Sequence, residues 1–341
     1  MTVAPVAVLG FAPLIGPAGE PVDFWRTATS HGLGWLPPFA PDDAHRSLTV
    51  VLPLPGGAPR AVRLSAEGGA VTVSAAGPPP SPGTAAALLT GVRHVLRLDA
   101  DLSGFYDLLA DDPELSWAVQ GAGRLLRAPS VFCDVVRTIC TTNCAWSATT
   151  RMVRALVDTL GEPTADGAMR AFPTPAAMAA AGEAFFATEI RAGYRARALH
   201  QLAVAVAEGA LDLESLTDPA LDDHHVEATL LALRGVGPYA AAHLLMLLGR
   251  YGSLTLDSWT RPTFLRISGM RQATDRTIQR RFSRYGQWAG LAFWLYLTRG
   301  WVPQEQAAPL ARAPLAPSQF PPAPFPPAQF TPAQFTPGDV P

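Results

Sequence analysis

The chain has 341 residues, of which 48% are hydrophobic and 16% are charged, and its formal net charge is −2. This length allows two domains or one large one. No uninterrupted apolar run reaches the roughly 20 residues that a membrane helix needs. The N-terminal segment lacks a basic start and is interrupted by prolines, which argues against a secretory signal. We therefore expect a soluble, cytoplasmic protein that does not enter membranes.

All 26 basic residues are arginine, and the chain contains no lysine. No side-chain amine is therefore available to form a Schiff base with a sugar aldehyde. The three cysteines, Cys133, Cys140 and Cys144, fall in one predicted helical region. Their spacing is not that of a four-cysteine iron–sulfur cluster, so we expect buried free thiols. No other residues have metal-ligand spacing, and we predict no metal site.

Residues 1–98 have the patterns of β-strands. Short β-branched or alternating runs are separated by glycine- and proline-rich turns. They occur at Ser47–Pro53, Arg60–Ser65 and Ala70–Ala75. We predict an antiparallel sheet of four or five strands, with a first strand near Val22–Ala28 and another at Gly91–Asp99. The loop that holds His31, Trp35 and Phe39 either packs on this sheet or lines a ligand pocket.

From Leu102 onward the apolar residues recur at helical spacing. The predicted helices are Leu102–Leu109, Glu114–Gly121, one that begins after Ser130, Ser147–Leu160, a short one within 172–181, Glu183–Glu189, Gly193–Glu208, Tyr239–Leu248, Pro262–Ile267, Asp275–Tyr285 and Trp288–Arg299. The segments Leu211–Leu216 and Pro219–Leu233 lead to the turn before Tyr239. The fold class is therefore α+β, with an antiparallel sheet domain at 1–98 and a mostly helical body at 99–301. Residues 302–341 are rich in proline, and we predict a disordered tail there.

The segment 233–257 carries the most specific chemical signal. Leu233–Gly237 has the form Leu-x-Gly-Val-Gly, and Pro238 then begins an apolar helix. The N–H groups of Gly235, Gly237 and Tyr239 lie at the positive end of that helix dipole, which favours an anion such as a nucleic-acid phosphate. Asp257 follows Gly237 by twenty residues. A plain structural reading also exists, in which the hairpin packs two helices and Asp257 caps the next helix.

This hairpin and aspartate resemble the helix-hairpin-helix (HhH-GPD) superfamily of DNA glycosylases. The resemblance implies that the hairpin holds the DNA backbone and that Asp257 is the catalytic carboxylate. It also implies double-stranded DNA with a damaged base as the partner. A monovalent cation that bridges hairpin and phosphate is possible, and no other cofactor is expected. We expect a monomer associated with the bacterial nucleoid.

Further residues resemble the 8-oxoguanine glycosylase branch of this superfamily. They are Ile139–Asn143, Met152 with Leu156, Gly161 and the segment Ala192–Arg197. By this resemblance Asn143 contacts the base opposite the lesion, Tyr194 enters the base stack, and Arg195 lies beside it. The branch has an arginine five residues after the asparagine, whereas this chain has Ala148. That difference weakens the case for 8-oxoguanine as the substrate.

The base pocket is expected to use aromatic side chains, and Trp146, Tyr239 and Trp259 are the candidates. Electron-rich rings attract an electron-poor alkylated purine. Bifunctional members of the superfamily have a lysine where this chain has Tyr239. We therefore predict a monofunctional glycosylase for alkylated purines. The alternatives are an 8-oxoguanine glycosylase without lyase activity, and a non-catalytic DNA-binding or damage-sensing protein.

The charges near the hairpin favour contact with DNA in spite of the net charge. The segment from Ser258 to Arg284 contains seven arginines and one acidic residue, Asp275. A basic face beside the hairpin would add contacts to phosphates that do not depend on base sequence.

Overall fold

A computed structural model describes residues 6–302 of the chain. The five strands form one antiparallel sheet in the order β1-β5-β4-β3-β2. Their bounds are β1 (Val6–Pro13), β2 (Phe39–Asp42), β3 (Ser47–Leu54), β4 (Gly57–Glu67) and β5 (Ala70–Ala76). Of the tail predicted at 302–341, all but Val302 lies outside the described residues.

Twelve α-helices occur within residues 6–302. They are α1 (Phe24–Ala28), α2 (Pro82–Val95), α3 (Ser103–Leu109), α4 (Val131–Thr141), α5 (Trp146–Leu160), α6 (Pro175–Thr188), α7 (Arg195–Ala207), α8 (Asp223–Ala232), α9 (Pro238–Leu248), α10 (Thr260–Ser268), α11 (Asp275–Phe282) and α12 (Ala289–Thr298). None of them is long and apolar enough to cross a membrane. The α+β class and the antiparallel sheet predicted from the sequence are confirmed.

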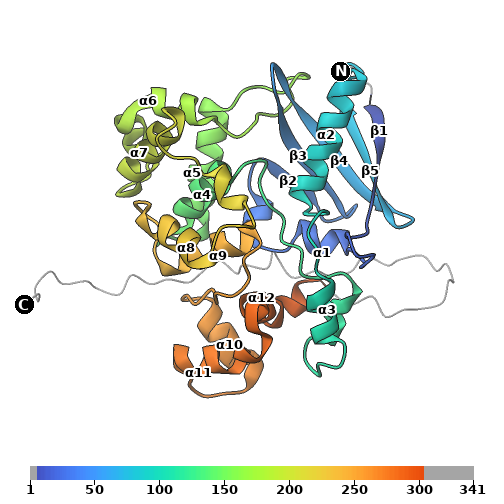
Figure 1. Cartoon of the computed structure of the whole chain (residues 1–341). Helices are drawn as coiled ribbons and strands as arrows, with labels where there is room; N and C mark the ends of the chain where they lie inside the picture. The colour runs from blue at the N-terminus through green and yellow to red at the C-terminus, as the bar shows by residue number, and fades with distance from the viewer. Residues whose placement is uncertain (1–5, 303–341) are drawn as a thin grey trace, which may run out of the picture.

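Two of the predicted strands are wrong, because local helix signals override the β-branched residues. Val22–Ala28 contains helix α1, and the Asp23 side chain caps it by accepting the N–H of Arg26 at 2.9 Å. Gly91–Asp99 begins inside helix α2, whose N-terminus has Ser81 as cap and Pro82 in its first turn. Helix α2 lies across the sheet (Figure 1) and packs its buried face on it. The edge strand β1 occupies a segment where the sequence indicated none.

The helical body follows the predicted elements closely. Ser130 caps α4 by accepting the N–H of Cys133, and Gly161 ends α5. Helix α6 is interrupted at Gly182, so it consists of two short helices as expected. The helix predicted at Glu114–Gly121 is instead a 3-10 turn, Ser116–Gln120. The three cysteines are free thiols, two of them buried and Cys144 partly buried.

The helices of the body fall into two groups, one formed by α4–α9 and the other by α3 with α10–α12 (Figure 1). The connection from α9 to α10, residues 249–259, passes from the first group to the second. It carries Asp257. The fold thus brings the hairpin before α9 and the N-terminus of α10 to the junction of the two groups.

Candidate functional site

The hairpin joins α8 to α9 and leaves backbone donors free. Gly235 has a φ of +88°, a conformation that favours glycine. Gly237 is extended, and a Cβ there would meet nothing within 4 Å. Within residues 6–302, the N–H groups of Gly235 and Gly237 form no backbone hydrogen bond, and that of Tyr239 lies in the first turn of α9. These three donors therefore lie at the N-terminal end of α9, where free N–H groups form the positive end of the helix dipole.

Asp257 lies just before α10 and is partly buried. Its Oδ1 accepts the N–H groups of Trp259 at 2.9 Å and Thr260 at 2.6 Å. Its own N–H donates to the Thr260 hydroxyl at 2.8 Å. Oδ2 makes no hydrogen bond to any part of the chain that the structure describes. Asp257 is therefore a helix cap, as one reading of the sequence proposed, and its second carboxylate oxygen has no hydrogen-bond partner among residues 6–302.

An aromatic cluster stands beside Asp257. Trp259 contacts Trp294 and Trp301, with ring centroids 5.9 and 5.7 Å apart. Trp294 contacts His243 at 6.3 Å, and His243 stacks on Tyr239 with an interplanar angle of 17°. We call these five residues the aromatic cluster. The sequence named Tyr239 and Trp259 as pocket residues, and the structure joins them through residues that it did not name.

Tyr239 and Asp257 influence each other electrostatically. Burial raises the pKa of the Tyr239 phenol, and the charge of Asp257 raises it further. The phenol therefore stays protonated at neutral pH, where it cannot act as a base. Tyr239 is thus a neutral hydroxyl within electrostatic reach of the Asp257 carboxylate.

An open cavity of about 600 Å³ lies between the two helical groups. Its walls come from α8 and α9, from the connection that carries Asp257, and from α10–α12, and they include Glu227, Tyr239, Ala242, Leu256, Arg261, Asp275, Gln279 and Ser283. Asp257 directly follows Leu256 in the chain, although Asp257 itself is not among the residues that line the cavity. The volume is within the ~300–1,000 Å³ typical of small-molecule sites.

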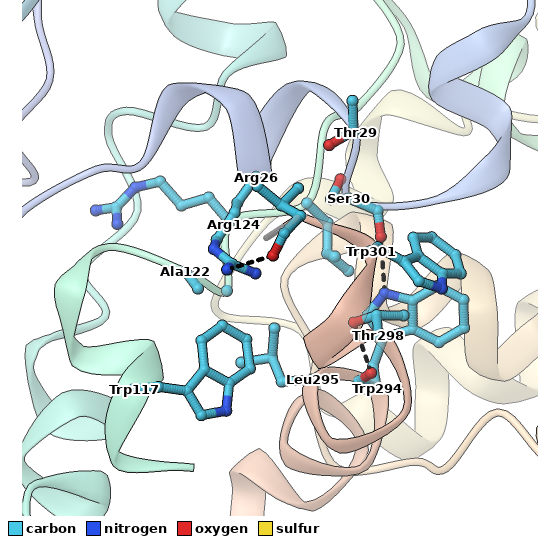
Figure 2. A pocket seen from close by; sticks show the side chains of 13 residues that line it. Arg26, Thr29, Ser30, Trp117, Ala122, Arg124, Trp294, Leu295, Thr298 and Trp301 are labelled. Atoms are coloured by element: carbon cyan, nitrogen blue, oxygen red, sulfur yellow. Dashed lines mark hydrogen bonds between the residues drawn. The ribbon is translucent and has the colours of Figure 1, made fainter. Parts of the chain in front are cut away.

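A second, small cavity of about 20 Å³ lies behind the aromatic cluster. Figure 2 shows Trp294 and Trp301 on one side of it and Trp117 on another. The Trp294 indole N–H donates to the Ser30 carbonyl at 2.8 Å. The cluster therefore joins the large cavity, which Tyr239 lines, to the N-terminal segment that holds Ser30.

Asn143, Tyr194 and Arg195, which the resemblance assigns to the orphaned base and the base stack, lie together, with Asn143 and Tyr194 exposed at the surface. The Asn143 amide donates to the Tyr194 hydroxyl at 3.1 Å, and the Arg195 guanidinium lies 4.4 Å from the centre of the Tyr194 ring. Asn143 has a φ of +46°. The Tyr194 side chain is 59% exposed, whereas Arg195 is buried and bonds the Thr142 hydroxyl. The buried Arg195 guanidinium therefore packs against the exposed Tyr194 ring from the interior side.

The remaining predicted residues are Trp146 and the arginines between Ser258 and Arg284. Trp146 begins α5, three residues after Asn143, and packs partly buried on the helical core. It belongs to the α4–α5 turn that carries Asn143. Of the seven arginines between Ser258 and Arg284, three pair with acids, namely Arg261, Arg281 and Arg284. The other four (Arg266, Arg271, Arg276 and Arg280) are exposed and form no ion pair with residues 6–302.

The sequence suggested that the loop with His31, Trp35 and Phe39 either packs on the sheet or lines a pocket, and its residues differ in this respect. Phe39 is buried in the core of the sheet domain, whereas His31 contacts His243 of the aromatic cluster with ring centroids 5.5 Å apart. His31 is therefore the residue of this loop that reaches the aromatic cluster. No group of three or more His, Cys, Asp or Glu residues within 6–302 is arranged to hold a metal ion.

The sequence matches no protein-family model and no curated protein. Solved structures are similar in fold. The protein MBOgg1, in complex with a low-affinity DNA ligand, shares 21% identity over 88% of this chain and 99% of its own, with a TM-score of 0.67. The 3-methyladenine DNA-glycosylase from Archaeoglobus fulgidus shares 19% identity, with coverage of 86% and 99% and a TM-score of 0.65.

A third similar structure is the apo form of the Clostridium acetobutylicum 8-oxoguanine glycosylase/lyase. It shares 18% identity over 82% of this chain and 93% of its own, with a TM-score of 0.64. The chain therefore has the fold of these glycosylases over most of its length, including the sheet domain. Because the similar structures act on different lesions, the fold does not select one.

Proposed function

We propose that this protein is a DNA glycosylase that hydrolyses the N-glycosidic bond of a damaged base in duplex DNA. The observation that carries the proposal is Asp257. One of its carboxylate oxygens is held by the α10 backbone, and the other is unbonded beside the aromatic cluster. A base buried in a duplex has to be flipped out before its glycosidic carbon is accessible, and the cavity between the helical groups is where a flipped nucleotide would enter.

The chemistry follows from the charge that develops on the sugar. When the glycosidic bond breaks, its electron pair leaves with the base and the sugar becomes an oxocarbenium-like cation. An ionised carboxylate in a fixed position stabilises that charge without reorganising. It also orients the water that adds to the sugar carbon and accepts the proton that the water loses. The unbonded Oδ2 of Asp257 is the atom assigned to both tasks.

The hairpin and the Asn143–Tyr194 pair supply the contacts to the rest of the duplex. The free N–H groups at the N-terminus of α9 suit a backbone phosphate, whose contact positions the DNA without reading its sequence. The exposed Tyr194 ring suits insertion into the base stack, and Asn143 next to it suits the orphaned base.

The two hairpin glycines give a matched pair of variants. Gly235→Ala forces a side chain into left-handed backbone, so we expect a loss of about 1–2 kcal/mol in the free energy of unfolding. The backbone at Gly237 is extended and a Cβ there meets open space, so we expect Gly237→Ala to leave the free energy of unfolding unchanged. The new methyl group would stand where a DNA phosphate approaches the hairpin. We expect the Kd of Gly237→Ala for duplex DNA to rise at least about tenfold, the effect of one hydrogen bond to a charged group.

Urea unfolding and fluorescence anisotropy with a labelled abasic-analogue duplex separate these two effects. If Gly237→Ala is fully stable and binds the duplex with wild-type affinity, the hairpin does not contact DNA.

Alkylated purines are the lesion class that the site suits best. Tyr239 lines the large cavity, and His243 links its ring to those of Trp294, Trp259 and Trp301, so electron-rich rings stand at and behind the cavity wall. Alkylation at a ring nitrogen makes a purine cationic, and a cation over such rings is stabilised by about 0.5–2 kcal/mol. The alternative, 8-oxoguanine, is favoured by the fold shared with the Clostridium acetobutylicum enzyme, and Ala148 argues against it.

We expect hydrolysis alone, without strand cleavage through a Schiff base. The chain has no lysine, and Tyr239 has no amine. Incubation with methylated duplex DNA and sodium borohydride should therefore trap no covalent adduct, while the Clostridium acetobutylicum glycosylase/lyase with 8-oxoguanine duplex serves as the positive control. A trapped adduct would show that the terminal amine acts as a nucleophile. Faster release from 8-oxoguanine duplex than from methylated duplex would reverse the lesion assignment.

A further inference from the structure

His243 lies in the middle of the aromatic cluster, and through its contact with His31 it joins the cluster to the N-terminal domain. Its ring stacks on Tyr239 one helical turn earlier and contacts Trp294. The ring of His31 meets it edge to face, with an interplanar angle of 83°. His31 is 1% exposed and His243 is 5% exposed. Two imidazoles from segments more than two hundred residues apart in sequence thus meet beside the proposed base site.

The hydrogen bonds of this pair are incomplete. His31 Nε2 lies 2.5 Å from the Leu126 carbonyl oxygen. Because a carbonyl only accepts, Nε2 carries the proton, and Nδ1 of a neutral His31 presents a lone pair. Nδ1 of His31 and Nδ1 of His243 are both buried without a partner in the described part of the chain. Buried polar atoms without partners are few in native proteins, and each calls for an explanation such as binding or catalysis.

Both histidines are neutral at physiological pH. Burial lowers the pKa of His243 to about 4, and the charge of Arg137 adds to this effect. Burial also lowers the pKa of His31 well below its ordinary value, and His243 and the nearby arginines lower it further. A neutral pair does not repel a cationic base, and it can exchange hydrogen bonds with the base edge.

We propose that His31 and His243 are specificity-determining residues that read the edge of the flipped base. His31 Nδ1 accepts a hydrogen bond from an amino group or ring N–H of the base, and His243 Nδ1 forms a second hydrogen bond with the adjoining atom of the same edge. Tyr239 lines the large cavity and covers His243, so the base displaces this ring to reach the pair. The substrate class is a purine with an N–H donor on that edge, such as 3-methyladenine. This inference rests on the proposed glycosylase function.

The test compares two variants that each remove a buried polar atom without a partner. His243→Leu removes Nδ1 from the pair. Tyr251→Phe removes a hydroxyl that is also buried and unpartnered among residues 6–302, on a ring stacked against Trp288, outside the aromatic cluster. Single-turnover release is measured for 3-methyladenine, formed by methylating a duplex, and for ethenoadenine, which has no N–H donor. Thermal unfolding is recorded for each protein.

We expect the wild type to favour 3-methyladenine, and His243→Leu to reduce that preference about tenfold or more, as for the loss of one hydrogen bond in a dry site. Tyr251→Phe should leave the preference unchanged. Neither variant should lower the thermal midpoint, because each removes an unpaired buried atom. An unchanged preference in His243→Leu, or equal losses on both substrates with a lowered midpoint, would overturn the proposal.

A binding measurement separates this inference from the glycosylase proposal itself. Free 3-methyladenine is titrated into the wild type while the imidazole nitrogen NMR signals are followed, with the two histidines assigned from their Leu variants. We expect the Nδ1 signals of His31 and His243 to shift. If no duplex releases a base but these signals move, the glycosylase proposal fails and the binding role stands. If bases are released but the signals stay, the histidine pair does not read the base.

Discussion

Asp257→Asn is expected to lower the rate of base release by about 10²–10³-fold or more, the cost of removing one preorganised electrostatic stabiliser of a transition state. The asparagine oxygen still accepts the N–H groups of Trp259 and Thr260, so the cap on α10 is kept. The folded structure should therefore survive with only the loss of a charge near a helix N-terminus, about 0.3–1 kcal/mol. Affinity for the duplex should stay within a few fold of the wild type or improve, because a negative charge near phosphates is removed.

Asp275→Asn is the matched control for Asp257→Asn. Asp275 lines the large cavity, and both of its oxygens are bonded to Arg261, at 2.7 and 2.9 Å. Single-turnover release and anisotropy with each variant compare the two carboxylates. We expect less than a tenfold change for Asp275→Asn. Equal losses in both variants would mean that the total charge of the cavity matters and that Asp257 has no special role.

Arg124→Met is expected to lower the free energy of unfolding by about 3–5 kcal/mol, the range for breaking a buried ion pair by removing one partner. Arg124 is fully buried and donates to Glu20 at 2.7 Å and to the Ala100 carbonyl at 2.8 Å. Its removal leaves the Glu20 carboxylate buried with its charge unpaired. The pair joins the segment after β1 to residues 97–102, which connect the sheet domain to the helical body, so both parts should unfold together at lower denaturant.

Arg93→Met is the control for this prediction. Arg93 pairs with Asp99 on the surface, where both side chains are well exposed, and such pairs contribute about 0–1 kcal/mol. Equal losses of stability in the two variants would contradict the account of the buried pair. Guanidinium unfolding monitored by tryptophan fluorescence measures both.

The effect of Arg124→Met also has an expected pH dependence. Burial alone would raise the pKa of Glu20, but the Leu102 N–H and Arg124 outweigh it and hold that pKa below its ordinary value of 4.5. A carboxyl whose pKa is lowered in the folded state stabilises the protein above its unfolded pKa and loses that contribution as pH falls. The difference between wild type and Arg124→Met should thus be complete at pH 7 and shrink below about pH 4.5.

The part of the site that is continuous in sequence could be predicted from it. The hairpin and Asp257 lie within 25 residues, and turn glycines, Pro238 and a cap fix their local geometry. The Asn143–Tyr194 pair was predicted from the resemblance, and the structure brings the two side chains together. In the N-terminal domain the β-branched residues were visible, but the caps at Asp23 and Ser81 decided for helices α1 and α2.

The residues that link the site across the fold could not be predicted. His243, Trp294 and Trp301 come from two distant segments, and the sequence of neither segment marks them as site residues; His31 was named as a possible pocket residue, but its contact with His243 was not foreseen. Trp294 and His243 lie in apolar helices in which almost every side chain is buried. Only the tertiary packing shows that these rings meet beside Asp257 and that the two imidazoles keep unpaired nitrogens.

The most direct test of the central claim is base release by the wild-type protein from a panel of duplexes that contain 3-methyladenine, 7-methylguanine, hypoxanthine, uracil or 8-oxoguanine. Free bases are quantified, and strand breaks are scored before and after alkali. The account predicts release of methylated purines, with strand breaks that appear only after alkali treatment. Duplex binding without release of any base would contradict it and would favour a protein that binds damaged DNA without acting on it.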